Sequence, residues 1–392
     1  MHASPEFDVA IVGARVAGAA TALLLARAGL KVVVLDRTTY GNDTLSTHAL
    51  MRAGVMQLSR WGLLDDVIAS GTPAVRRTTF FVGPDPLVIS IKPAYGVDAL
   101  YAPRRTVLDP MLVDAAAAAG ADIRFGVTAS GLERADDGRV TGLLGHDAGG
   151  APLRVRARLV VGADGPGSSV AEWVGAETTR RGRAAGAVAY GYWEGLDLDG
   201  YEWYFRPGVT AGAIPTNDGL TCVFVGTTPE RFRAELAPRP QSGFVSLLAE
   251  GAPELMDRMG GARPPSQLRR FPGRRPGHLR QSWGPGWALV GDAGYWKDPL
   301  SVHGLTDAMR DAELLARAAV AVVEPGDQEA ELARYQDTRD RLSTRLFDTT
   351  DAIAGYGWDI DAISSLLLQL SSAMTDEVEA LAALDEMAPA TA

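Results

Sequence analysis

The chain has 392 residues, of which 38 are Lys or Arg and 48 are Asp or Glu, so its formal net charge is −10. This acidic balance disfavours nucleic acid as a partner, because binding to phosphate backbones needs clustered positive charge. Hydrophobic residues make up 46% of the chain, which is ordinary for a packed protein and excludes general disorder. At roughly 150 residues per domain, this length predicts two or three domains.

Neither a targeting segment nor a cysteine-based metal centre is indicated. Residues 1–7 lack the basic and apolar segments of a signal peptide, and no run of about 18 apolar residues is present that would span a bilayer. Cys222 is the one cysteine, which excludes an intrachain disulfide. We therefore expect a cytoplasmic protein without a metal, either a monomer or a homodimer, that acts on a small molecule.

The first forty residues predict a strand at 8–12, a helix at 19–28 and a second strand at 31–35. Gly13 and Gly18 flank the turn between the first strand and the helix, and Asp36 follows the second strand. Such a turn brings backbone N–H groups and a helix N-terminus to a dinucleotide pyrophosphate, while the acid accepts hydrogen bonds from a ribose. The unit therefore predicts a dinucleotide site, although Arg15 replaces the usual middle glycine.

The elements that follow mix helices with short strands. The predicted helices are 54–68, 107–119, 306–323 and a tail at 334–387 that breaks at 355–357. The predicted strands are 78–82, 87–91, 122–125, 154–161, 287–290 and several within 182–228. Asp164 follows one of these strands and Asp292 another, in the turns Gly-Ala-Asp-Gly and Gly-Asp. Open α/β sheets bind ligands at this end of their strands.

These three spaced motifs resemble those of the flavoprotein monooxygenases of the para-hydroxybenzoate hydroxylase type. The resemblance covers about residues 1–345, and a match without gaps runs from Gly291 to Ala312. It implies non-covalent FAD, NADH or NADPH as the reductant, and O2. The residues that it assigns to FAD are Gly13, Arg15, Gly18, Asp36, Arg37, Arg105, Asp164, Gly165, Gly291, Asp292, Pro299, Gly304 and Leu305.

Two departures from the family pattern concern charged ligands. Arg15 either contacts a phosphate in place of the missing glycine or points to solvent. Ala171 stands where the family usually has an arginine that engages NAD(P)H, which shifts that role to Arg180, Arg181 or Arg183. The Arg-rich stretch at 269–280 is interpreted as a solvated loop between domains, with attraction of an acidic ligand as the alternative.

The candidate catalytic residues are His48 and His303. His303 adjoins Gly304 and would touch flavin or substrate, whereas His48 would face the isoalloxazine or simply begin a helix. The candidate substrate-binding residues are Tyr190, Tyr192, Trp203, Phe205, Ile214 and Pro215. The aromatic members suit a flat apolar substrate, but alternating aromatic residues in strands also serve sheet packing.

The expected fold class is α/β: a Rossmann-like FAD-binding domain with a parallel sheet and helices, an inserted, mostly antiparallel substrate domain, and C-terminal helices. The FAD-binding domain would take 1–72, 99–180 and 276–345, the substrate domain 73–98 and 181–275, and the helical segment 346–392.

The resemblance implies an FAD-dependent monooxygenase of secondary metabolism that hydroxylates or epoxidises a small, largely apolar aromatic or polyketide-like molecule. An isoprenoid-type reductase of carbon–carbon double bonds is the alternative. A flavin-dependent halogenase is disfavoured, because Ile214 and Pro215 follow Ala-Gly-Ala rather than the tryptophans of that family. A non-catalytic escort is a further alternative, but it would need none of the three acids.

Overall fold

The parallel strands predicted from the three motifs form one sheet in the computed structural model, which describes residues 6–265, 267–273, 275–323, 328–385 and 387. Its central order is β16-β17-β8-β1-β2-β5, and the five strands from β17 to β5 run parallel. Their bounds are β1 (Phe7–Val12), β2 (Val32–Asp36), β5 (Asp122–Phe125), β8 (Pro152–Gly162), β16 (Trp283–Gly284) and β17 (Trp287–Leu289). The hairpin of β6 (Thr128–Arg134) and β7 (Val140–His146) extends it through β8.

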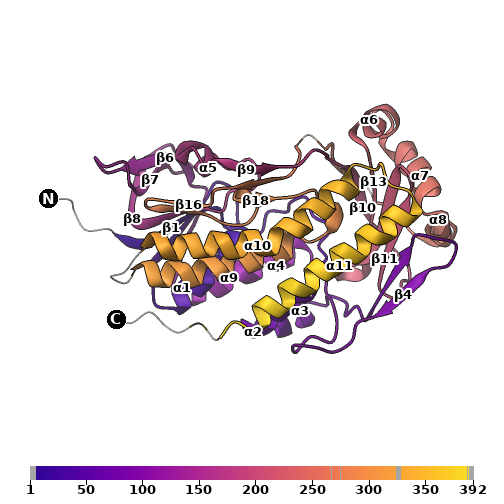
Figure 1. Cartoon of the computed structure of the whole chain (residues 1–392), viewed down its shortest axis with the longest axis horizontal. Coiled ribbons are helices and arrows are strands. Elements are labelled where there is room, and N and C mark those ends of the chain that lie inside the picture. Colours follow the sequence, from indigo (N-terminus) through magenta and orange to yellow (C-terminus); the bar gives the residue numbers. More distant parts are fainter. Residues whose placement is uncertain (1–5, 266, 274, 324–327, 386, 388–392) are drawn as a thin grey trace.

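Helices pack on this sheet because it is apolar on both faces. α1 lies against α4 and α9, α10 packs on α9, and α11 packs on α10 and α2 (Figure 1). The bounds are α1 (Val16–Arg27), α2 (Arg52–Arg60), α3 (Leu64–Ala69), α4 (Arg105–Ala118), α5 (Ser169–Val174), α9 (Gly304–Val323), α10 (Gln328–Ala354) and α11 (Ile360–Ala382). None of the helices in the described part of the chain combines the length and apolar character needed to cross a bilayer.

A second, seven-stranded sheet occupies the other end of the molecule (Figure 1). Its order is β14-β10-β13-β12-β11-β3-β4, and all neighbours are antiparallel except β11 and β3. The bounds are β3 (Arg77–Phe81), β4 (Leu87–Ser90), β10 (Ala187–Glu194), β11 (Tyr201–Arg206), β12 (Val209–Pro215), β13 (Leu220–Thr227) and β14 (Arg269–Phe271). The prediction of an α/β fold with an additional, mostly antiparallel sheet is therefore confirmed.

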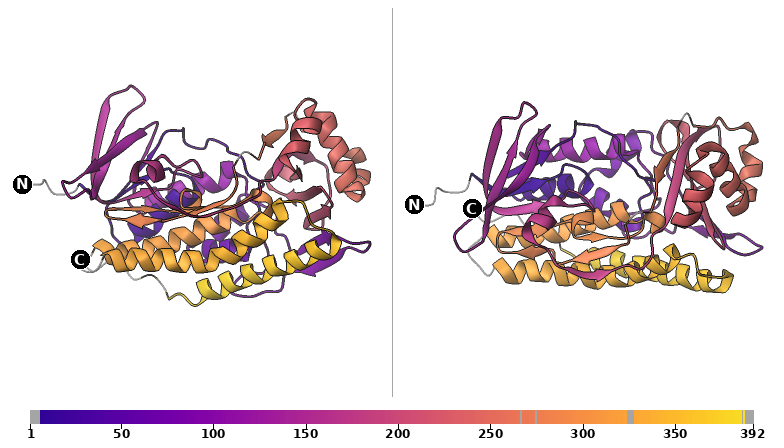
Figure 2. Two further views of the ribbon diagram at one scale, coloured as in Figure 1. Left: turned by 45° about the horizontal axis from the view of Figure 1, so that its top comes forward. Right: turned by 90° about the horizontal axis from the view of Figure 1, so that it is seen from above.

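The period of two along these strands decides what each face covers. Ala187 and Ala189 of β10 pack with helix residues such as Phe244, whereas Val188 and Tyr190 point to the opposite core, which includes Ile363 of α11. The covering helices are α7 (Pro240–Gly251) and α8 (Pro253–Arg258), and the short α6 (Pro229–Arg231) precedes them. The two further views in Figure 2 show these helices on the outer side of the sheet, away from α10.

A three-stranded sheet lies between the two large ones and has the order β18-β15-β9. Its strands are β9 (Thr178–Arg181), β15 (His278–Arg280) and β18 (Tyr295–Trp296). The short turns are η1 (Asn217–Gly219), η2 (Phe232–Leu236), η3 (Met259–Gly261), η4 (Gly291–Ala293) and η5 (Pro299–Ser301).

Two local expectations need correction. The helix expected at 54–68 is divided into α2 and α3, because Gly62 adopts a φ of 70° and ends the first helix. The stretch at 269–280 is not simply a solvated loop, since it contributes β14 and β15 to two sheets. The outermost residues of the predicted end segments, 1–5 and 388–392, lie outside the described residues.

Candidate functional site

Three carboxylates gather at the carboxyl edge of the parallel sheet. Asp36 ends β2, Asp164 follows β8, and Asp292 follows β17, and these strands lie in one sheet with β1 between β8 and β2. From β1 the chain adds β2 and β5 on one side and β8 and β17 on the other, so a crevice opens where the order reverses. All three acids line a cavity of about 650 Å³ there, a volume in the ordinary range of cofactor sites.

Gly13 and Gly18 allow the β1–α1 turn to close tightly. Gly13 has a φ of 105°, and a Cβ placed on it would lie 2.5 Å from the carbonyl oxygen of Ala163. A Cβ on Gly18 would lie only 1.8 Å from the carbonyl oxygen of Gly13. Side chains at these positions would push α1 away from the sheet, so the two glycines hold the positive helix N-terminus at the rim of the cavity.

Asp36 is held in a fixed orientation. Its Oδ2 accepts a hydrogen bond from the Ala14 backbone N–H at 2.7 Å, and its Oδ1 accepts from both the N–H and the hydroxyl of Thr38, each at 2.7 Å. The residue is buried but still lines the cavity. A carboxylate oxygen accepts about two hydrogen bonds, so Oδ2, which accepts one here, retains capacity for a ribose hydroxyl group.

Asp164 and Asp292 differ in how their carboxylates are used. Asp164 accepts hydrogen bonds from the Ser168 hydroxyl at 2.5 Å and from the Ser169 N–H at 2.7 Å, so it caps the start of α5. For Asp292, burial raises the pKa to about 6, although the charges of Lys297 and Arg105 oppose that rise. Asp292 is therefore poised to become a stronger acceptor when a ligand brings hydroxyl donors to it.

The side chain of Arg15 is held by an ion pair and does not point freely to solvent. Its Nη1 lies 3.2 Å from Asp109 Oδ2, and Asp109 is also held by Arg105 through bonds of 2.7 and 2.8 Å. Both arginines line the cavity, and one carboxylate between two guanidinium groups leaves a net positive charge. This arrangement suits an anionic group such as a pyrophosphate.

The residues at this edge fit FAD. The cavity combines a helix N-terminus, three arginines and five acids with a volume for an extended ligand. Most residues assigned to FAD by resemblance line it: Gly13, Arg15, Asp36, Arg37, Arg105, Asp164, Gly165, Asp292, Pro299, Gly304 and Leu305. Gly18 and Gly291 lie just behind the wall, where a Cβ on Gly291 would approach the Ala17 Cβ to 2.9 Å.

His48 lies in the cavity wall in a strained conformation. Its φ is 72°, it is buried, and its Nε2 is 2.5 Å from the Tyr192 hydroxyl. Burial, together with Arg105 and Arg104, lowers the pKa of His48 well below its ordinary value, so the imidazole is neutral. Its Nδ1 has no partner among the described residues. It does not begin a helix, because α2 starts at Arg52.

The structure separates the expected substrate-binding residues. Tyr190 lines the cavity and its hydroxyl accepts the Ser46 N–H at 2.9 Å, while Tyr192 lies behind His48. Trp203, Phe205 and Ile214 instead lie in the core on one face of the seven-stranded sheet, together with α11 residues. Pro215 ends β12 and is likewise absent from the cavity wall. Period-two packing, rather than ligand contact, accounts for those aromatic side chains.

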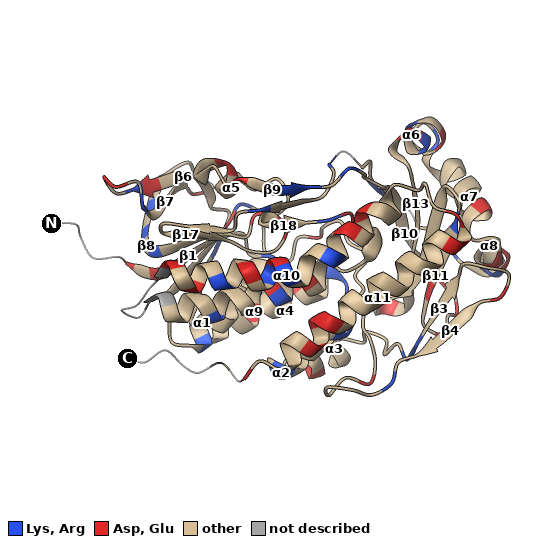
Figure 3. Ribbon diagram, viewed as in Figure 1, with Lys and Arg blue, Asp and Glu red and all other residues tan. Residues whose placement is uncertain are grey.

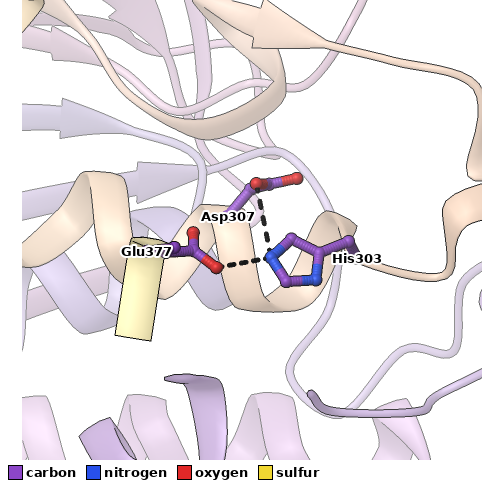
Figure 4. A group of neighbouring side chains, drawn as sticks. All are labelled: His303, Asp307 and Glu377. Atoms are coloured by element: carbon purple, nitrogen blue, oxygen red, sulfur yellow. Dashed lines mark hydrogen bonds and ion pairs between the residues drawn. The ribbon is translucent and has the colours of Figure 1, made fainter. Parts of the chain in front are cut away.

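His303 also lies away from the cavity wall, contrary to the expected contact with flavin or substrate. It is buried, and its Nε2 lies 2.6 Å from Glu377 Oε2 of α11 and 3.9 Å from Asp307 Oδ1 (Figure 4). The geometry of these three groups would admit a metal ion. However, Arg310 already pairs with both carboxylates, at 3.0 Å from Asp307 and 2.9 Å from Glu377. We therefore interpret the cluster as an ion-pair network.

Sequence reasoning missed several residues in the cavity wall. Val188, Phe271 and Trp296 supply an apolar part, and Lys297 and Asp307 form an ion pair beside it. The sequence offers one indication that Lys297 belongs to the site: it is one of three lysines in the chain and follows Asp292 by five positions. No local sequence pattern indicates Phe271, because its position in the cavity depends on the pairing of β14 with β10.

Comparisons with known proteins agree with this geometry. A family model described as an FAD binding domain matches residues 6–350. Digeranylgeranylglycerophospholipid reductase 1 of Methanothermobacter thermautotrophicus is 26% identical over 386 residues, which cover 91% of each chain. Aklavinone 12-hydroxylase DnrF of Streptomyces peucetius is 29% identical over 377 residues, which cover 89% of this chain and 74% of its own length.

Two solved structures share the fold. PqsL of P. aeruginosa, in complex with 2-aminobenzoylacetate, has a TM-score of 0.80 at 21% identity and covers 92% of this chain and 99% of its own. The flavin-dependent brominase Bmp2 has a TM-score of 0.80 at 19% identity and covers 96% of this chain and 93% of its own. At these identities the likeness concerns the fold alone.

Proposed function

Because the chain belongs to the family defined by this FAD-binding domain, and is thus an FAD-dependent oxidoreductase, we propose that it is a monooxygenase. It uses NADH or NADPH and O2 to hydroxylate or epoxidise a small, largely apolar aromatic or polyketide-like molecule. The observation that carries the proposal is the apolar wall formed by Tyr190, Phe271 and Trp296 in the same cavity as the FAD-binding residues. The aklavinone 12-hydroxylase among its relatives supports this substrate class.

The residues of the chain would bind and orient FAD and the substrate, while the cofactor supplies the redox chemistry that side chains lack. The N-terminus of α1 and the arginines Arg15 and Arg105 would hold the pyrophosphate, and Asp36 and Asp292 would accept the ribose and ribityl hydroxyl groups. Gly304 begins α9 at the cavity wall, and its lack of a side chain leaves the backbone accessible to the ring. The apolar wall would exclude water from the substrate.

His48 is the proposed catalytic residue. Its neutral imidazole lies in the cavity wall, and the buried Nδ1, which has no partner among the described residues, would accept a hydrogen bond or a proton from a substrate hydroxyl that reaches it. The Tyr192 hydroxyl at Nε2 fixes the orientation of the ring, and the Arg104 guanidinium stacks on Tyr192 at 4.2 Å from its centroid. Removing the proton from a phenol or enol makes its carbon skeleton more nucleophilic toward an oxidant.

The reductant would be recognised at a basic surface beside the cavity. The arrow of β9 is blue in Figure 3, because this strand ends in two arginines. Partial burial lowers the pKa of Arg280, and the nearby charges of Arg275 and of Arg181 on β9 lower it further. Arg275 donates to the carbonyl oxygen of Pro166, which lines the cavity. We assign the phosphates of NADH or NADPH to this surface.

A reductase of carbon–carbon double bonds is the second candidate. One observation favours it: the digeranylgeranylglycerophospholipid reductase aligns along 91% of both chains. The apolar wall would also accept an isoprenoid chain. A halogenase remains disfavoured, since the alanines and glycine before Ile214 lie within β12 and leave no tryptophan there.

Oxygen consumption separates the two candidates. The purified protein, loaded with FAD, is mixed with NADPH or NADH and a panel of aromatic polyketides in an oxygen electrode. The monooxygenase predicts substrate-dependent O2 uptake and a product heavier by one oxygen atom, labelled from 18O2. Anaerobic saturation of an isoprenoid double bond, without O2 uptake on any aromatic substrate, would establish the reductase instead. A protein that does not bind FAD would contradict both.

A further inference from the structure

Lys297 is a buried amine in the wall of the cavity. Its side chain is 4% exposed, and its Nζ forms an ion pair with Asp307. Asp307 belongs to the first turn of α9, three residues after Gly304, so the amine lies beside the positive end of a 20-residue helix. The mechanism described so far does not use this group, although few amines are buried next to a ligand cavity.

Charged groups from several elements surround the amine. The groups that face it are Asp292 of η4, the Tyr295 ring of β18, His303, Asp307, Arg310 and Asp311 at or near the start of α9, and Glu377 of α11. Burial first, and then Arg310, lower the pKa of Lys297 to about 7, although the acids resist this change. At neutral pH the amine is therefore close to the balance between its charged and neutral forms.

The geometry points to Lys297 as a positioning residue that takes up a proton from solvent when the bound flavin is reduced. This inference rests on the proposed function. Hydride transfer from a nicotinamide brings two electrons and one proton, so it leaves one negative charge on the flavin ring. One proton from solvent on the Lys297 amine compensates this charge, and the proton returns to solvent when the ring is reoxidised. The α9 N-terminus adds a fixed partial charge, whereas Lys297 adds a switchable one.

The competing interpretation is a permanent ion pair between Lys297 and Asp307 that only stabilises the fold. The structure makes the two separable. Asp307 Oδ1 is also 3.0 Å from Arg310 Nη1, so a variant without the lysine still leaves this carboxylate partnered. The Lys297→Met variant should therefore fold and bind oxidised FAD, and Lys297→Arg keeps a charge that does not titrate in the working range.

The first measurement follows the protonation of the Lys297 amine by NMR. The chain has three lysines, Lys31, Lys92 and Lys297, so 15N-lysine labelling gives few side-chain signals, which Lys297→Met assigns. We expect the Lys297 Nζ to titrate near pH 7 with oxidised FAD bound, and its midpoint to rise by at least one pH unit, a tenfold change in proton affinity, after anaerobic reduction. A midpoint above pH 9 in both redox states, or one unchanged by reduction, would overturn the inference.

The second measurement compares binding of oxidised and dithionite-reduced FAD by anaerobic equilibrium dialysis from pH 6 to 9. In the wild type, the affinity ratio of reduced to oxidised FAD should fall about eightfold across this range if the Lys297 midpoint rises by one unit from pH 7, and further for a larger rise. Lys297→Arg should hold the ratio at its pH 6 value, and Lys297→Met should hold it at the pH 9 value. Lys31→Met is the matched control, because that lysine is exposed and lies 5.2 Å above the Phe7 ring.

The outcomes distinguish this inference from the proposed function. If FAD does not bind, the proposed function and the inference fail together. If FAD binds but Lys297→Met keeps the wild-type pH dependence, only the role of Lys297 is rejected. If Lys297→Met does not fold, the wild-type titration and the Lys297→Arg ratio still decide the question.

Discussion

The turn beside the FAD cavity has no room for a side chain at Gly18. A Cβ at this position would lie 1.8 Å from the Gly13 carbonyl oxygen, which is backbone and cannot rotate away. We expect Gly18→Ala to lower the free energy of unfolding by at least about 1–3 kcal/mol, the usual cost of overpacking, and to weaken FAD binding. Urea unfolding and FAD titration measure both effects. Gly131→Ala is the control, because no atom lies within 4 Å of its Cβ; equal losses in both variants would refute the steric explanation.

Asp292 should make FAD binding depend on pH. Burial raises its pKa to about 6, and the ionised form is the better acceptor for hydroxyl groups, so affinity for FAD should rise as the pH increases from 5 to 7. Loss of a hydrogen bond to a charged group costs about 1.5–3 kcal/mol. Asp292→Asn should therefore bind FAD roughly 10- to 100-fold more weakly at pH 7.5 and lose most of the pH dependence, as measured by flavin fluorescence. An unchanged pH profile would exclude Asp292 from the site.

His48 should affect turnover more than cofactor binding. Its φ of 72° favours asparagine as a replacement, because asparagine tolerates this conformation better than most residues. We expect His48→Asn to retain FAD but to reduce kcat about 100-fold or more, the typical contribution of a general base. Stopped-flow and steady-state kinetics test this. Full activity in the variant, or loss of FAD, would reject the role as a base.

At the scale of elements, Glu377 joins α11 to the start of α9 through Arg310 and His303. Burial raises the pKa of Glu377, but its contacts with His303 and Arg310 outweigh burial and lower it to about 2. A carboxylate with a lowered pKa stabilises the fold above its unfolded pKa of roughly 4.3, and this stabilisation is lost as the pH falls from there toward 2.

Glu377→Gln should therefore destabilise the protein by about 3 kcal/mol at pH 7, since it leaves the buried Arg310 short of one negative partner. The difference from the wild type should narrow below about pH 4.3, where the wild-type carboxylate begins to lose its advantage. Chemical unfolding at several pH values measures this, with the exposed Glu379→Gln on the same helix as the control. A constant difference down to pH 3 would contradict the ion-pair explanation.

Elements with strong local signals were predictable from sequence. The strand at 122–125 is observed as β5 with the same bounds, and the helix expected at 107–119 is α4, which begins at Arg105. The β6–β7 hairpin and helices α7 and α8 were not expected. Helix α7 depends on the seven-stranded sheet beneath it, and such tertiary contacts override local preference. The β6–β7 hairpin instead pairs within itself and with the following strand β8.

The candidate site also has a part that local sequence motifs predict and a part that depends on tertiary contacts. Glycines and acids at strand ends are visible in sequence because each motif is contiguous, and they mark the cavity at Gly13, Asp36 and Asp292. The side of the cavity that faces the substrate comes from strand pairing, which brings Phe271 beside Val188. The placement of each candidate residue as FAD ligand, base or substrate contact, and the domain boundaries, remain predictions.

At the scale of the whole molecule, the cavity joins the two large sheets. Gly13 and Asp36 belong to the parallel sheet and its turns, whereas Val188 and Phe271 belong to the seven-stranded sheet. A ligand that fills this cavity would contact residues of both sheets. Its binding free energy should therefore stabilise both sheets together, by about 2.7 kcal/mol when free FAD is present at 100 times its Kd.

Hydrogen exchange with and without FAD tests this coupling. We expect added FAD to slow exchange in the β1–α1 turn and in β10 and β14, because these segments carry wall residues from opposite sheets. Helix α7 is the internal control, since it packs on the face of the seven-stranded sheet that looks away from the cavity. The protection should disappear in Asp292→Ala. Protection confined to the parallel sheet would mean that FAD does not reach the seven-stranded sheet, and it would contradict the proposed coupling of the two sheets.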